Sequence, residues 1–141
     1  MIAAERYAAC QQLIAEFWGQ LDRDDYEGLV SLMVPDGRWN RAGKWREGVA
    51  EVRAAMDERP GGLFVRHVIT NLRCEDGADG VHCRYYLTAF SSRSANAGPP
   101  PYPAGPPSLL ADYHSICVET PDGWRMKELS GQFAFRTVLA A

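Results

Sequence analysis

"LFVRHVITNLRCEDGADGVHCRYYLTAFSS", residues 63–92, decides the fold. Two runs rich in β-branched and aromatic residues flank "DGADG", a turn signal, and this pattern is typical of a long antiparallel hairpin. A turn centred between residues 78 and 79 pairs Cys74 with Cys83, Asn71 with Tyr86 and His67 with Phe90.

A second hairpin follows. The runs at 108–119 and 124–138 flank "TPDG" at 120–123, which suits a tight turn. Between the two hairpins lies "SANAGPPPYPAGPP" at 94–107, which is too rich in Pro and Gly for regular structure. We expect this segment to be a functional flap or a mobile connection.

The residues before the hairpins follow a helical period. Apolar residues at steps of three or four predict a long amphipathic helix that ends near Asp22. They are Tyr7, Cys10, Ile14, Phe17, Trp18 and Leu21. A second, short helix is predicted with Asp24 as N-cap and Pro35 as its stop. A third helix is predicted from about Gly48 to Arg59.

A small hairpin is predicted between the second and third helices. Its segment, "PDGRWNRAGKW" at 35–45, holds two turn signals, Asp36-Gly37 and Ala42-Gly43. The order of elements predicts one α+β domain over residues 1–141, with three N-terminal helices packed in a curved, mainly antiparallel sheet.

Both faces of the long hairpin are rich in apolar residues. Alternation places Val68, Thr70, Leu72, Cys74, Cys83, Tyr85, Leu87 and Ala89 on one face. The opposite face takes Val65, His67, Ile69, Asn71, Tyr86 and Phe90. Only one face can lie over the helices, so we expect the face with Val68, Leu72, Tyr85 and Leu87 to form a homodimer.

Composition narrows the possible partners. The 141 residues carry a net charge of -3 with both signs scattered, so no basic stripe for nucleic acid is present. No apolar run approaches the roughly 18 residues of a membrane span, and charges interrupt the N-terminal segment where an export signal would be apolar. We therefore expect a cytoplasmic protein that binds neither nucleic acid nor membrane.

The four cysteines lack the spacing of a metal site. Cys10, Cys74, Cys83 and Cys117 form no CxxC or CxxH pair. We expect reduced core residues, with Cys74 and Cys83 opposite one another as thiols, and neither metal nor cofactor.

Three segments carry a resemblance to a known family. They are "DRDDYEGLVSLMVPDGRW" (22–39), "RHVITNLRCEDGADGVHCRYY" (66–86) and "YHSICVETPDGWRMKEL" (113–129). Their order resembles the nuclear-transport-factor-2-like superfamily, and within it the SnoaL-like branch. The resemblance implies a cone: helices close one end of the curved sheet, an apolar pocket opens at the other, and the outer face of the sheet forms a homodimer.

The same resemblance implies candidate catalytic residues. Catalytic members place a Tyr on the second helix, an Asp at its end and a His on the first long strand, which match Tyr26, Asp36 and His67. His67 would then be an acid-base group oriented by Asp36, with Tyr26 bonded to a substrate carbonyl. The alternatives are a hydrogen-bonded core histidine, a turn aspartate and a packed tyrosine. Ser115 stands where many relatives carry an acidic residue.

Further residues are candidates for substrate binding. They are Trp39, Asn71, Tyr86, Phe90 and His114. Because Tyr113 and His114 alternate along a strand, only one of the two can line a pocket. Trp39 could instead belong to the core, as tryptophans at such spacing often do.

The branch contains members of two functional classes. One comprises dehydratases, isomerases and cyclases that act on steroid, polyketide or aromatic substrates without metal or cofactor. Resemblance to it implies a cofactor-independent lyase or isomerase for a hydrophobic cyclic or aromatic small molecule. The alternative is a non-catalytic ligand-binding dimer or the small subunit of a ring-hydroxylating dioxygenase.

Overall fold

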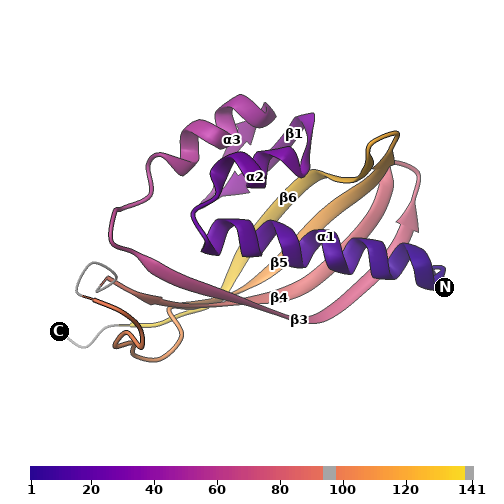
Figure 1. Ribbon diagram of the computed structural model, residues 1–141. Coiled ribbons are helices and arrows are strands. Elements are labelled where there is room, and N and C mark those ends of the chain that lie inside the picture. Colours follow the sequence, from indigo (N-terminus) through magenta and orange to yellow (C-terminus); the bar gives the residue numbers. More distant parts are fainter. Residues whose placement is uncertain (94–97, 139–141) are drawn as a thin grey trace.

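The computed structural model describes residues 1–93 and 98–138, and in it three helices pack against one curved sheet (Figure 1). The helices are α1 (Ala4–Asp22), α2 (Tyr26–Ser31) and α3 (Gly48–Met56). The strands are β1 (Met33–Arg41), β2 (Lys44–Glu47), β3 (Phe64–Gly77), β4 (Gly80–Ser92), β5 (Leu109–Thr120) and β6 (Gly123–Arg136). This arrangement confirms the predicted α+β class.

The six strands follow the order β2-β1-β6-β5-β4-β3. All neighbours pair antiparallel except β1 and β6, which run parallel. The sheet is not closed, because β2 and β3 form its two edges. The predicted small hairpin thus extends the sheet of the two long hairpins.

The core lies between α1 and the concave face of the long strands (Figure 1). The predicted stripe of α1 is buried there from Cys10 to Leu21, apart from Tyr7, which is half-buried. Its 3.6-residue period places one side of the helix on the sheet, and burial of that apolar side holds the helix in place. The end of α1 at Asp22 is as predicted.

Three predicted boundaries are wrong. The N-cap of α2 is Asp25, whose carboxylate accepts from the Gly28 backbone N–H, while Asp24 adopts a left-handed conformation in the link from α1. Pro35 lies within β1, since α2 already ends at Ser31. The third helix ends at Met56, short of Arg59.

The predicted turn at Asp36-Gly37 is also wrong. Both residues belong to β1, where the register against β6 shifts between Met33 and Arg38. The parallel partner strand, which local sequence does not reveal, keeps this segment extended around an irregularity. The Ala42-Gly43 signal does form the turn between β1 and β2, with φ of 52° and 82°.

The long hairpin departs from simple alternation at one point. Cys74 pairs with Cys83 as predicted, but His67 pairs with Ala89, and Tyr86 pairs with Thr70 in place of Asn71. The cause is a bulge between Thr70 and Arg73, where Asn71 has a φ of 57°. Past a bulge the alternation of faces is offset by one residue. Leu72 and Cys74 therefore share the inner face with His67 and Ile69, whereas simple alternation puts them on opposite faces.

The predicted dimer face is therefore wrong in composition. Tyr85 and Leu87 are buried in the core, and Leu72 packs against it. The outer face instead carries a row formed by consecutive cross-strand pairs: Val68, Thr88, Leu110 and Phe135. Val68 is 43% and Phe135 71% exposed. The homodimer itself remains a prediction.

Part of the Pro-rich segment, residues 94–97, lies outside the described residues, and 98–107 has no regular structure. Tyr102 of this segment packs against Phe64, with ring centroids 4.7 Å apart. Across the described chain, none of the helices is both long and apolar enough to cross a bilayer.

Candidate active site

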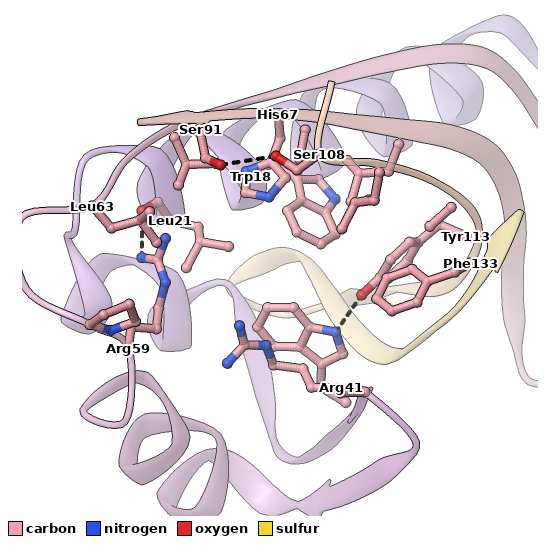
Figure 2. Close-up of a pocket in the computed structure, with 18 of the residues that line it drawn as sticks. Trp18, Leu21, Arg41, Arg59, Leu63, His67, Ser91, Ser108, Tyr113 and Phe133 are labelled. Atoms are coloured by element: carbon pink, nitrogen blue, oxygen red, sulfur yellow. Dashed lines mark hydrogen bonds between the residues drawn. The ribbon is translucent and has the colours of Figure 1, made fainter. Parts of the chain in front are cut away.

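A cavity of about 520 Å³ opens on the concave side of the sheet, beyond the C-terminal end of α1 (Figure 2). Its walls are mainly apolar, formed by Trp18, Leu21, Val65, Leu87, Leu109 and Phe133. A few polar side chains are set into these walls, chiefly His67, Tyr113 and Arg41. An apolar cavity with few polar groups is typical of a site for a small organic molecule.

The imidazole ring of His67 lines this cavity, and the carboxylate of Asp22 contacts it. Nδ1 of His67 lies 2.6 Å from Oδ1 of Asp22, and the His67 backbone N–H donates to Oδ2 of the same carboxylate at 2.9 Å. Both side chains are about nine-tenths buried, at 11% and 10% exposure. The carboxylate thereby fixes the ring orientation and the tautomer with the proton on Nδ1.

The other ring nitrogen of His67 is available for chemistry. Within residues 1–93 and 98–138, no side chain or backbone group hydrogen-bonds Nε2, and His67 lines the cavity. With the proton on Nδ1, Nε2 is an acceptor. The Asp22 carboxylate lies against Nδ1, where it would stabilise an imidazolium formed when Nε2 takes up a proton, so the pair is suited to accept and return a proton.

Tyr113 provides the phenol of the cavity, which settles the choice between Tyr113 and His114. The indole N–H of Trp39 donates to the Tyr113 hydroxyl at 2.8 Å (Figure 2). Burial raises the pKa of Tyr113 to about 12, so the hydroxyl remains protonated in neutral solution. Its own proton is free to be donated to a substrate oxygen.

The three catalytic candidates from the sequence do not meet. His67 lines the cavity, but Asp36 is exposed on β1 and is not among the residues that line it. Asp22 takes the orienting position that the sequence had suggested for Asp36. Tyr26 lies behind the wall, where its hydroxyl accepts from Arg59 at 3.0 Å and donates to Asp24 at 3.2 Å.

Of the substrate-binding candidates, Trp39 lines the cavity and the other four do not. Asn71 is exposed in the β3 bulge. Tyr86, Phe90 and His114 lie on the outer face, since they are out of phase with the buried Tyr85, Leu87 and Ala89 along their strands and cross-strand pairs. The unpredicted bulge explains part of this error, because Asn71 was assigned the side of His67.

Three residues of the site were missed by sequence reasoning. The sequence marks Asp22 only as the end of a helix. The signal that points to it as a site residue is a carboxylate on the final residue of an amphipathic helix. For Tyr113, alternation along the strand shows only that either it or His114 faces the cavity. Arg41 carries no local signal, because its place in the cavity depends on the parallel pairing of β1 with β6.

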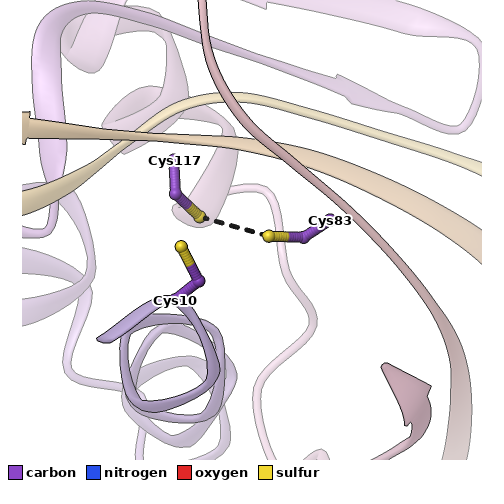
Figure 3. A group of neighbouring side chains, drawn as sticks. All are labelled: Cys10, Cys83 and Cys117. Atoms are coloured by element: carbon purple, nitrogen blue, oxygen red, sulfur yellow. Dashed lines mark hydrogen bonds between the residues drawn. The ribbon is translucent and has the colours of Figure 1, made fainter. Parts of the chain in front are cut away.

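A possible metal-ligand group lies elsewhere, in the core. The sulfur atoms of Cys10, Cys83 and Cys117 lie within 4.8 Å of one another (Figure 3). All three residues are fully buried, and hydrogen bonds to Cys10 and Cys117, together with burial, raise the pKa of Cys83. Thiolates bind soft ions such as Cu(I) and Zn²⁺, but here three buried thiols would have to lose protons without a contacting cation. We therefore interpret Cys10, Cys83 and Cys117 as residues that fill the core. All four cysteines of the chain are free thiols.

Comparison with known proteins identifies relatives of this fold. A family model described as the SnoaL-like domain matches residues 3–130. No curated protein matches the sequence.

Solved structures share the architecture at low sequence identity. Aln2 from a Streptomyces species superposes with a TM-score of 0.81 at 20% identity, covering 94% of each chain. An NTF2-like protein with a cystatin-like fold from Novosphingobium aromaticivorans gives 0.75 at 21%, covering 92% of this chain and 82% of its own. A candidate scytalone dehydratase from the same organism gives 0.76 at 15%, covering 95% and 87%. At such identities the likeness concerns the fold.

Proposed function

This chain belongs to the SnoaL-like domain family, and on that premise we propose that it is a cofactor-independent lyase or isomerase acting on a hydrophobic cyclic or aromatic small molecule. The observation that carries the proposal is the open Nε2 of His67, which faces an apolar cavity while Asp22 holds Nδ1. A histidine that served only the core would have both nitrogens bonded or enclosed.

The proposed reaction begins with a proton transfer to His67. Nε2 removes a proton from the carbon next to a substrate carbonyl, and the electron pair of the broken C–H bond moves toward the carbonyl oxygen. The Tyr113 hydroxyl donates a hydrogen bond to that oxygen as negative charge develops there. Asp22 stabilises the imidazolium formed in this step.

The second step decides between lyase and isomerase. In a lyase the C–O bond to a β-hydroxyl breaks, the enolate electrons form the new double bond, and the imidazolium returns its proton to the departing oxygen as water leaves. In an isomerase the same proton returns to a different carbon and no group leaves. The name of one structural neighbour, a candidate scytalone dehydratase, favours the elimination.

The second candidate function is ligand binding without turnover, alone or as the small subunit of a ring-hydroxylating dioxygenase. Glu58 is the single carboxylate that lines the cavity from the described part of the chain, and it is paired with Arg46 at 3.0 Å. A mechanism that needs a second free carboxylate in the cavity is therefore disfavoured, and a binding role requires none.

A panel of cyclic β-hydroxy ketones and cyclic unsaturated ketones tests the proposal. Each compound is incubated with the protein, and mass spectrometry follows loss of water or appearance of an isomer. The enzyme hypothesis predicts conversion of at least one member that depends on the protein. Binding of panel members by calorimetry without conversion of any of them would favour the binding role.

A further inference from the structure

The charged groups around the cavity are unequally paired. Among the described residues, four arginines and one carboxylate line it: Arg41, Arg46, Arg59, Arg93 and Glu58. Arg46 is bound to Glu58, and Arg59 to Asp24 at 3.1 Å and to the carbonyl of Leu21 at 3.2 Å. Arg93 is exposed to solvent.

Arg41 differs from the other three. Among the residues that the structure describes, no carboxylate, carbonyl or hydroxyl is within hydrogen-bond or ion-pair distance of its guanidinium. Its guanidinium carbon lies 5.0 Å from the centroid of the Trp39 ring. Figure 2 shows its side chain on the wall opposite His67.

An unpaired guanidinium in such a place costs stability. Burial lowers the pKa of Arg41, which means that the folded protein disfavours its charged form, although an arginine stays charged at neutral pH. An arriving anion would restore the interactions that the guanidinium lost with water. The guanidinium carbon lies 5.0 Å from the centroid of the Trp39 ring, a contact that uses none of the guanidinium N–H donors. A guanidinium can donate two parallel hydrogen bonds to a carboxylate.

We propose that the substrate is a carboxylic acid, bound through its carboxylate to Arg41 while its ring reaches His67. The inference rests on the proposed function only for the role of His67. One unpaired arginine matches one negative charge, so a monoanionic carboxylate fits better than a dianionic phosphate ester. The apolar wall between Arg41 and His67 would hold the ring system.

Calorimetric titration with two probes of equal size tests this without any turnover. The probes are 2-naphthoate and the neutral 2-naphthamide. The wild-type protein should bind naphthoate at least about 10-fold more tightly, because a charged hydrogen-bond pair replaces a neutral one in a partly dry site. Equal affinities, or no naphthoate binding up to millimolar concentration, would overturn the proposal.

Variants assign the preference to one residue. Arg41→Met should bring the affinities for naphthoate and naphthamide to within about 2-fold of one another. Arg73→Met is the matched control, since Arg73 is an exposed arginine of β3 that does not line the cavity, and it should retain the full preference. A preference that survives in Arg41→Met would refute the assignment.

The unliganded variant gives a second readout. If Arg41 is held for a ligand, Arg41→Met should unfold at the same temperature as wild type or higher, because an unpaired and largely buried charge is lost. A lower unfolding temperature would indicate a structural role and contradict the proposal. His67→Gln should retain the naphthoate preference. The binding preference therefore tests the role of Arg41, whatever effect His67→Gln has on catalysis.

Discussion

Asp22, the last residue of α1, holds both the backbone N–H and the ring Nδ1 of His67 in mid-β3, at 2.9 and 2.6 Å. One carboxylate thus joins the end of the longest helix to an edge strand of the sheet. The His67 ring is positioned by the same contact that joins the helix to the sheet, so the fold itself orients the proposed base.

Replacing Asp22 tests that relationship. Asp22→Asn retains an acceptor for the backbone N–H but removes the charge that stabilises the imidazolium, so turnover should fall by roughly 10²-fold. Initial rates with a panel compound measure the effect. Asp36→Asn is the matched control on an exposed aspartate, and it should leave the rate unchanged. A larger loss in Asp36→Asn than in Asp22→Asn would contradict the assignment.

Tyr113→Phe removes the proposed donor to the substrate oxygen. We expect the rate constant of the chemical step to fall by roughly 10- to 10²-fold with little change in substrate affinity. Because burial raises the pKa of Tyr113 to about 12, the wild-type rate should not decline through ionisation of this group below about pH 10. A rate that falls with a tyrosine-like pKa near 9, and loses that feature in Tyr113→Phe, would disagree with this environment.

His114, on the outer face of the sheet, should affect the stability of the protein in acid. Burial lowers the pKa of His114, and Arg84 and His82 lower it further. Nε2 of His114 also lies 2.9 Å from Nδ1 of His82, and the other ring nitrogen of His82, Nε2, lies 2.6 Å from Oδ1 of Asp79. Since the folded pKa is below the unfolded value of about 6.5, this contribution is complete above pH 6.5 and is lost as the pH falls from 6.5 through the lower folded pKa.

Thermal unfolding between pH 7.5 and 5 measures this contribution. The wild-type midpoint should fall more steeply than that of His114→Gln, by a few degrees over the range. Parallel curves for the two proteins would show that His114 does not contribute.

The corrected outer row predicts how two copies associate. Val68, Leu110 and Phe135 expose apolar surface on one face, so we expect a homodimer at micromolar concentration and a monomer after Phe135→Asp. Sedimentation velocity distinguishes the two states. Val138→Asp places the same charge on another exposed residue outside this row and should remain a dimer. A monomeric wild-type protein would end the prediction.

The sequence predicted the elements better than it predicted the site. Alternation, turn signals and the helical period place two long hairpins and three helices where the structure has them, because these are local signals. The bulge at Asn71 and the parallel pairing of β1 with β6 are not local, since each depends on a partner strand. The bulge determines which residues of β3 lie on the same face as His67. The parallel pairing of β1 brings Arg41 to the cavity.

The central claim is that Nε2 of His67 moves a proton on a molecule bound in the cavity. The direct measurement is exchange of carbon-bound hydrogen for deuterium in cyclic ketones from the substrate panel, followed by NMR in heavy water with wild type, His67→Gln and His82→Gln. His82→Gln makes the same substitution at a histidine that does not line the cavity. The account predicts exchange with wild type and His82→Gln and a loss of roughly 10²- to 10⁴-fold in His67→Gln. Equal exchange rates in His67→Gln and wild type would contradict it.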